Sequence, residues 1–169
     1  GLSGLVLYSG GAKGVDTLSM NAALDARGSA VGILAHSLEK AIRPPDIQRA
    51  LKRGDLCLAT PYSPNAGFSV GAAMGRNRLI YCLANYAIVV ASDAEKGGTW
   101  AGATEALKNG WVPVFVLDHA AMPDGNRMLL QKGGVAFPHP FPEHYSKLPE
   151  WLQEHTASHK TQATQLGLF

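Results

Sequence analysis

The sequence predicts an α/β protein of Rossmann type, with a doubly wound, mostly parallel sheet and helices on both faces. Three observations support this prediction. The short apolar runs are continuous rather than alternating, segments with helical periodicity separate them, and glycine-rich turns follow two of the runs. Continuous apolar strands separated by helices are typical of parallel strands that are covered on both faces.

The expected elements alternate along most of the chain. Apolar runs predict strands at residues 5–8, 30–34, 56–59, 86–91, 112–117 and 135–137. Helical periodicity predicts helices at residues 18–26, 46–53, 76–83, 99–108 and 126–132. Gly28 ends the first helix, and Pro44-Pro45 begins the second, because a first turn tolerates the fixed φ and missing N–H of proline. Thr99 or a neighbour is expected to cap the fourth helix.

Length and composition exclude several classes of protein. The chain has 169 residues, of which 46% are hydrophobic and 17% charged, as expected for one folded domain and not for a disordered chain. No apolar stretch reaches the ~18 residues of a membrane span, and the first residues lack the basic segment of a signal peptide. Cys57 and Cys82 show no metal-ligand spacing, so we expect buried free thiols in a reducing cytoplasm and no metal site.

Positive charge is concentrated in one segment. The formal net charge is only +2. Between residues 40 and 53, however, a single carboxylate, Asp46, faces five cations: Lys40, Arg43, Arg49, Lys52 and Arg53. Such a cluster is either a solvated helix face or, beside phosphate-binding features, part of a polyanion-binding surface.

Two glycine-rich turns connect a predicted strand to a predicted helix, at the end of the sheet where ligands bind in such folds. They are Ser9-Gly-Gly-Ala-Lys-Gly-Val-Asp16 and Lys96-Gly-Gly-Thr99. Consecutive backbone N–H groups and the positive end of a helix dipole favour a phosphate there, and Lys13 adds an ammonium group. The alternative is that the glycines serve only the turn, with Asp16 or Thr17 as a local cap. Neither turn has a dinucleotide or P-loop pattern, so no cofactor is predicted.

Several motifs resemble those of the DprA/Smf family of DNA-processing proteins. The segment Ser9–Asp16 is similar to the family's SGGARGID signature, and Arg43-Pro-Pro-Asp46 to its YPP segment. Gly75-Arg-Asn-Arg-Leu-Ile80 is similar to its RNRIIAGLS stretch. Ala87–Val90, the second turn and residues 126–137 follow in the family's order, so that the resemblance covers residues 5–137.

The resemblance implies a cytoplasmic, commonly dimeric protein that binds single-stranded DNA and delivers it to the RecA recombinase in recombination and natural transformation, without catalysis. Carried over residue by residue, its DNA contacts fall on Lys13, Phe68 and the Arg76-Asn77-Arg78 segment. Cations and aromatic faces are the groups that hold single strands. With the glycine turns, the predicted phosphate- and DNA-binding residues are Ser9, Gly10, Gly11, Lys13, Gly14, Asp16, Phe68, Arg76, Asn77, Arg78, Gly97, Gly98 and Thr99.

The two arginines have an alternative interpretation. The predicted helix places Arg76 and Arg78 at its first turn, where the helix dipole disfavours cations unless an anion lies nearby. That anion is either a DNA phosphate or a carboxylate in an ion pair: Asp16, Asp93 or Glu95.

A second hypothesis is a nucleotide-binding or nucleotide-cleaving enzyme of the same superfamily. The segment Lys96–Glu105 resembles the PGGxGTxxE motif of lysine-decarboxylase-like phosphoribohydrolases, with Glu105 one position out of register. Hydrolysis also needs a second positioned acid or base, for which the sequence offers no candidate. We therefore rank the enzyme second.

The expected organisation has three parts. Residues 1–142 form the Rossmann-like domain, in which the family's first strand, with its Gly-Ser-Arg motif, has no counterpart. Residues 143–155 form a short helix, and residues 156–169 a flexible tail. The final Gln165-Leu-Gly-Leu-Phe169 resembles the QLxLF peptide that binds the bacterial sliding clamp, which implies contacts by Gln165, Leu166, Leu168 and Phe169.

Overall fold

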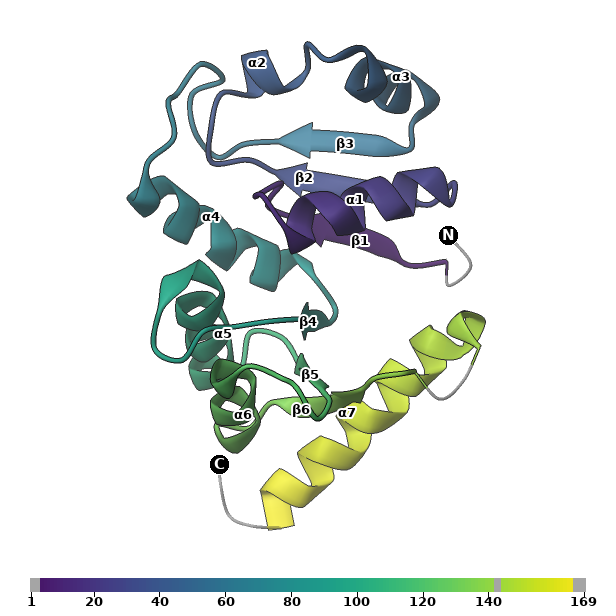
Figure 1. The fold of residues 1–169 in the computed structure, drawn as a ribbon, viewed down its shortest axis with the longest axis vertical. Coiled ribbons are helices and arrows are strands. Elements are labelled where there is room, and N and C mark those ends of the chain that lie inside the picture. Colours follow the sequence, from purple (N-terminus) through teal and green to yellow (C-terminus); the bar gives the residue numbers. More distant parts are fainter. Residues whose placement is uncertain (1–3, 142–143, 166–169) are drawn as a thin grey trace. The chain divides into compact units, whose positions relative to one another are not determined.

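Two three-stranded parallel sheets form the framework of the protein, one in each of two compact units, residues 1–84 and 85–169 (Figure 1). The structure is a computed structural model that describes residues 4–141 and 144–165. The boundary between the units falls inside the range 1–142 that the sequence predicts as one domain. The α/β class and the parallel strands are confirmed, and each predicted strand occurs within a few residues of its expected bounds.

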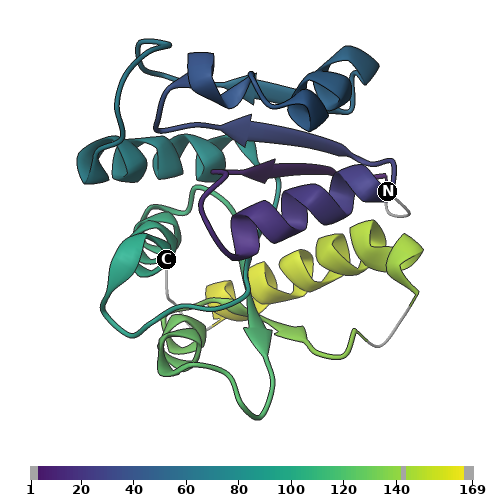
Figure 2. The same cartoon turned by 45° about the horizontal axis from the view of Figure 1, so that its top comes forward.

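The first unit has the strand order β1-β2-β3. Its strands are β1 (Val6–Ser9), β2 (Ser29–Ile33) and β3 (Leu56–Ala59), and its helices are α1 (Val15–Asp25), α2 (Leu38–Ala41), α3 (Pro45–Arg53) and α4 (Val70–Leu83). Helix α1 packs on β1 and β2, α3 on β3, and α4 on β1 and β2. Figure 2 shows α1 lying along β1.

A small apolar core holds this sheet against its helices. Met20, Ala30, Ala50 and Leu56 are buried at its centre. Gly32 of β2 allows the helix and the neighbouring strand to approach, because a Cβ there would lie 2.6 Å from Leu58 and 3.2 Å from Met20. Apolar residues of the strands and of the helices thus form one core in this unit, as the continuous apolar pattern of the strands predicts.

The second unit has the strand order β4-β5-β6. Its elements are β4 (Ala87–Val89), α5 (Gly97–Asn109), β5 (Val114–Asp118), α6 (Asp124–Gln131), β6 (Val135–Pro138), the 3-10 turn η1 (Tyr145–Lys147) and α7 (Leu148–Gln165). Phe115 of β5 and Trp151 and Leu152 of α7 form its core. Trp151 meets Phe137 edge to face at 5.3 Å and stacks on His155 at 3.8 Å. Aromatic packing therefore fixes α7 on β6.

Three expected boundaries are wrong. Helix α4 begins at Val70 rather than Arg76, because the Ser69 hydroxyl accepts a hydrogen bond from the Ala72 N–H (3.1 Å) and caps it. Helix α5 begins at Gly97, and no side chain caps it, so Thr99 lies inside the helix. Helix α7 continues to Gln165, so residues 156–165 are helical rather than flexible; the segment 150–165 contains no glycine or proline to stop it.

Two further expectations concern single residues. Cys57 and Cys82 are free, as expected, but exposed rather than buried. Cys57 lies on β3, the last strand of its sheet. The clamp-like peptide is described only at Gln165, since Leu166, Leu168 and Phe169 lie outside the described residues. Within the described chain, no helix combines the length and the apolar character of a membrane span.

Candidate nucleic-acid interface

The turn between β1 and α1 is built around Asp16. Its carboxylate accepts hydrogen bonds from the N–H groups of Gly10 (3.1 Å) and Ala12 (3.3 Å), and the Ser9 hydroxyl accepts one from Gly11 (3.4 Å). These N–H groups were expected to receive a phosphate. Instead the local-cap alternative is correct for them, because a carboxylate of the same chain already occupies the position of the anion.

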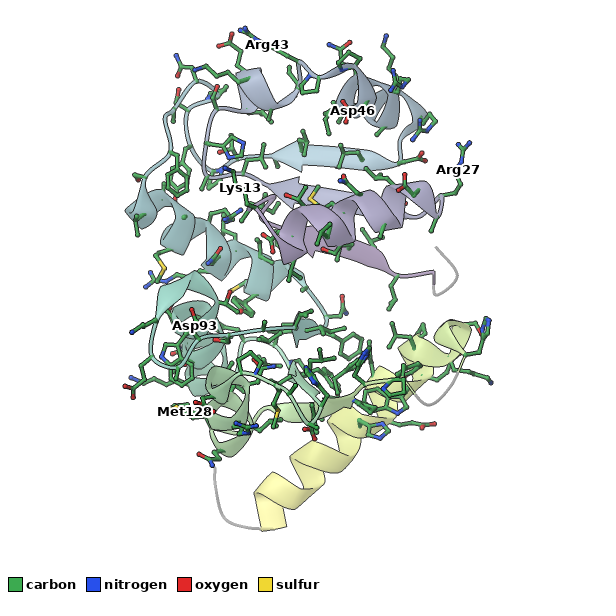
Figure 3. All side chains as sticks on the ribbon, viewed as in Figure 1. Lys13, Arg27, Arg43, Asp46, Asp93 and Met128 are labelled. Atoms are coloured by element: carbon green, nitrogen blue, oxygen red, sulfur yellow. The ribbon has the colours of Figure 1, made fainter. Side chains whose placement is uncertain are left out.

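The next N–H groups of the turn remain available. Among the described residues, no acceptor bonds the backbone N–H groups of Lys13, Gly14 or Val15. Gly14, at φ +93°, precedes the 11-residue helix α1 and has nothing within 4 Å of the position of a Cβ. Lys13 is exposed and lies at the end of the sheet to which the strands run (Figure 3). An exposed helix start with an adjacent ammonium group is suited to an anion.

Arg76 holds this turn through hydrogen bonds to its backbone. The guanidinium, 5% exposed, donates through Nη1 to the carbonyl oxygens of Gly10 and Ile33, the second at 2.6 Å. A Cβ on Gly10 would lie 2.0 Å from the same Nη1, so only glycine leaves room for the contact. Burial lowers the pKa of Arg76, and the charge of Asp16 opposes that shift.

The predicted position of Arg76 in its helix is therefore wrong. Since α4 begins at Val70, Arg76 lies in the middle of the helix and not at its first turn. Its guanidinium is buried against two carbonyl groups, so it positions the turn. Arg78 is exposed and Asn77 half-buried, so the neighbouring members of the motif remain accessible.

The loop between β3 and α4 presents Phe68. Thr60 Oγ1 donates to the Leu34 carbonyl (2.9 Å), and the Tyr62 hydroxyl donates to the Ala72 carbonyl (2.8 Å). These bonds fix the loop at both ends, while Phe68 is 66% exposed. Phe68 is thus not part of the core, and its ring is accessible for stacking.

The second glycine turn, in residues 85–169, opens into a small cavity. It has a volume of about 260 Å³ and is lined by Ala91, Ser92, Asp93, Lys96, Gly97, Gly98, Thr99 and Pro123. The buried Asn126 builds its wall: Oδ1 accepts from the Ser92 N–H (2.9 Å), and Nδ2 donates to the carbonyls of Val90 (3.1 Å) and Leu117 (2.9 Å). The three bonds fix the loop after β4 to β5 and α6.

Asn126 is a positioning residue for which the sequence predicted no specific role. Its neighbour Gly125 contributes by close approach, since a Cβ there would lie 2.2 Å from the Ser92 carbonyl oxygen. The Gly-Asn pair after a proline in the segment 123–126 was the available signal. Among the described side chains, no cluster is arranged to hold a metal ion.

The fold and these turns define a Rossmann-like α/β protein with glycine turns at the carboxyl ends of parallel strands. The family model of DNA recombination-mediator protein A matches residues 2–144, so the chain belongs to this family. The resemblance inferred from the motifs is confirmed.

Solved structures agree. DNA processing protein A (DprA) from Streptococcus pneumoniae is similar at a TM-score of 0.66 and 26% identity, over 81% of this chain and 50% of that chain. DNA processing protein A from Helicobacter pylori, whose structure is described for its single-stranded DNA binding mode, is similar at a TM-score of 0.65 and 25% identity. This match covers 88% of this chain and 66% of that chain. The chain thus spans half of the first relative and 66% of the second. No curated protein is significantly similar to it.

Proposed function

We propose that the chain binds single-stranded DNA in DNA processing and recombination, with the turn between β1 and α1 as its central phosphate contact. The observation that carries this proposal is the row of N–H groups at Lys13, Gly14 and Val15. They have no acceptor among the described residues and lie beside the exposed Lys13 ammonium group. Backbone amides and a mobile cation hold a phosphodiester without reading the base, as a sequence-independent DNA-binding protein requires.

Phe68 supplies the base contact of this interface. The Lys13 turn follows β1 and the Phe68 loop follows β3, two strands away in the same sheet. Neighbouring strands lie about 4.8 Å apart, so the ends of β1 and β3 are about 10 Å apart. A single strand that crosses this edge meets N–H groups and a cation at one point and an aromatic face at another.

The second turn supports a separate phosphate contact. Its cavity is open beside Lys96 and the start of the 13-residue helix α5. Gly97 and Thr99 then bind through a backbone N–H group and a hydroxyl rather than through a charged side chain, while Gly98 makes a contact within the chain. Asp93 in the lining limits how much negative charge this cavity accepts, so we assign it the weaker contact.

The partners and the compartment belong to the same proposal. We infer a cytoplasmic homodimer that delivers DNA to a recombinase of the RecA type and performs no catalysis itself. The family match favours this function over the nucleotide-cleaving enzyme, for which Glu105 was the candidate. Titration of the protein with AMP beside oligo-dT separates the two functions, since an enzyme of nucleoside monophosphates must bind AMP.

The DNA-binding proposal is tested by fluorescence anisotropy with labelled oligo-dT. We expect binding to be salt-sensitive and to weaken by about tenfold in Lys13→Ala. The buried charge of Arg76 should make no direct contribution to it. Binding that is unchanged in Lys13→Ala at the same salt concentration would remove the turn from the interface.

The clamp-like peptide supports one further partner. Gln165 ends α7, and the residues after it carry two leucines and a terminal phenylalanine. We propose that this peptide binds the bacterial sliding clamp, since burial of two large apolar side chains contributes about 1.5–3 kcal/mol each. Binding of the purified clamp that persists after Leu168→Ala/Phe169→Ala would exclude it.

A further inference from the structure

A groove between α2 and α3 takes no part in the interface described above. It has a volume of about 450 Å³ and is lined by Glu39, Ile42, Arg43, Gln48, Leu51 and Lys52. Ile42 is 41% exposed although it is a large apolar residue, and Leu51 packs with its other side against the core of the first unit. The groove therefore has an apolar lining that is anchored in the core and charged residues around it.

The segment 39–55, which supplies the lining of this groove, carries all of the excess positive charge of the chain. Residues 39–55 contain five Lys and Arg and three Asp and Glu, a balance of +2. The rest of the chain contains the remaining ten cations and ten carboxylates (15 − 5 and 13 − 3), a balance of zero. The groove thus lies in the most positive segment of the sequence.

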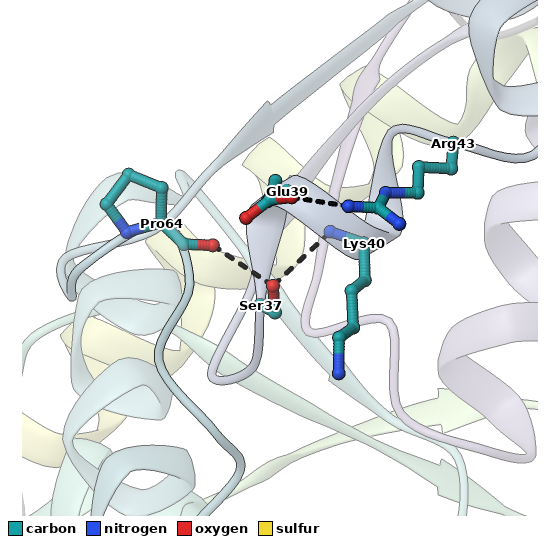
Figure 4. Close-up of polar contacts among 5 residues, drawn as sticks. All are labelled: Ser37, Glu39, Lys40, Arg43 and Pro64. Carbon is teal, nitrogen blue, oxygen red and sulfur yellow. Dashed lines mark hydrogen bonds and ion pairs between the residues drawn. The ribbon is translucent and has the colours of Figure 1, made fainter.

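Part of this charge is not neutralised within the segment. Arg43 pairs with Glu39, and Arg53 pairs with Asp55 at 2.6 Å. Among the described residues, the side chains of Lys40, Arg49 and Lys52 form no ion pair or hydrogen bond. Figure 4 shows the Lys40 side chain extending away from the Glu39–Arg43 pair. Of the two cations that line the groove, Lys52 is therefore available without loss of an existing contact, whereas Arg43 exchanges Glu39 for the anionic partner.

The α2 end of the groove continues the row of segments at the carboxyl edge of the sheet, whereas Leu51 and Lys52, at the end of α3, lie toward the start of β3. Helix α2 follows β2, which lies between β1, with the Lys13 turn, and β3, with the Phe68 loop. The Pro64 carbonyl of that loop accepts a hydrogen bond from the Ser37 hydroxyl (3.2 Å; Figure 4) and another from the Glu39 N–H (3.0 Å). The start of α2 is thus bonded directly to the loop that presents Phe68.

We propose that this groove is a second contact for the same single-stranded DNA, in which a nucleobase lies on Ile42 and Leu51 and flanking phosphates bind Lys52 and Arg43. The inference rests on the proposed function and extends it beyond the glycine turns. An acidic peptide would be attracted by the same charge. Continuity with the Phe68 loop favours the DNA, because a strand that leaves that loop reaches α2 next.

The test compares oligo-dT of about 4 and about 16 nucleotides, the range of site sizes for single-strand-binding modules. Arg43→Gln/Lys52→Gln should weaken binding of the longer oligonucleotide about tenfold. It should also reduce the slope of log K against log salt concentration by about 1.4, which is 0.7 for each phosphate contact. The shorter oligonucleotide, held by the Lys13 turn, should bind as before. Glu39→Gln should strengthen binding of the longer one by about threefold, because it removes the nearest carboxylate.

Arg27→Gln is the control, since Arg27 is an exposed cation of the same unit that does not line the groove. It should change neither affinity. If the groove variant binds the longer oligonucleotide like the wild type while Lys13→Ala weakens both, the groove proposal is wrong and the proposed function stands. If the wild type binds neither, both fail. A 16-residue poly-glutamate tests the acidic alternative. If only the groove variant loses binding of this peptide, and its DNA binding is unchanged, the groove binds an acidic protein and the proposal is overturned.

Discussion

The guanidinium of Arg76 lies directly against the backbone of Gly10. Its Nη1 donates to the Gly10 carbonyl, and a Cβ at residue 10 would approach the same nitrogen to 2.0 Å. The middle of α4 is therefore bonded to the end of β1, where the chain turns toward Lys13. This contact explains why a glycine and an arginine far apart in the sequence belong to one structural unit.

Gly10→Ala should destabilise the protein, because the added methyl group displaces a buried guanidinium from two carbonyl groups. We expect the free energy of unfolding to fall by about 1–3 kcal/mol, as in other overpacked sites. Urea denaturation measures the change. Gly71→Ala in α4, where a Cβ meets nothing within 4 Å, is the control and should be neutral or stabilising. Equal stability of the two variants would contradict the contact.

Arg76 and Arg78 should respond differently to mutation. Arg76→Met leaves the carbonyls of Gly10 and Ile33 without a donor and should lower stability by about 1–3 kcal/mol. Arg78→Ala removes an exposed side chain and should change stability by less than about 0.5 kcal/mol, while it weakens binding of oligo-dT. Denaturation and anisotropy on both variants test this division. A stable Arg76→Met protein with weakened DNA binding would show that Arg76 contacts DNA after all.

Phe68→Ala should weaken binding of single-stranded DNA without affecting the fold. Stacking of a base on an aromatic ring contributes about 1–3 kcal/mol, so affinity should fall about 5- to 150-fold. Phe68→Trp should retain binding, whereas Phe68→Leu, which keeps apolar area but no flat ring, should not. If Leu and Trp bind equally well, the contact is apolar and not a stacking interaction.

Stability should fall at alkaline pH because of Tyr81. Burial, together with the charge of Asp16, raises the pKa of Tyr81 to about 12. The folded state therefore retains a proton that the unfolded chain loses near pH 10, so the contribution is present below pH 10 and is lost as pH rises toward 12. The loss is on the order of 2 kcal/mol. Denaturation between pH 9 and 12 measures it, and Tyr81→Phe should flatten this part of the profile; an unchanged profile would contradict the assignment.

The sequence predicted the strands and the turns better than the roles of individual side chains. Leu56–Ala59 occupies the expected strand, because four apolar residues between polar ones allow few alternatives. In the sequence, Asp16 was compatible with a local cap or with a phosphate site. In the structure its carboxylate accepts hydrogen bonds from the N–H groups of Gly10 and Ala12, while the N–H groups of Lys13 to Val15 have no acceptor among the described residues. Only the placement of the carboxylate in three dimensions separates the two groups of N–H donors.

Arg76 and Arg78 show why the roles of individual side chains could not be predicted from the sequence. Once α4 begins at Val70, a spacing of two residues places Arg76 and Arg78 on different faces of one helix. The sequence alone placed the helix start at Arg76, because Gly71 and Gly75 disfavour a helix and the Ser69 cap was missed. Helix α2 was missed for a related reason: four residues are too few to show a period.

The central claim is that the N–H groups of Lys13, Gly14 and Val15, and not those of Gly10 and Ala12, receive a phosphodiester. Amide chemical shifts of isotope-labelled protein, followed during titration with oligo-dT, test it most directly. We predict large shifts at residues 13–15 and small ones at residues 10 and 12, whose N–H groups remain bonded to Asp16. Shifts centred on residues 10 and 12, or none in the turn at saturating DNA, would contradict the account.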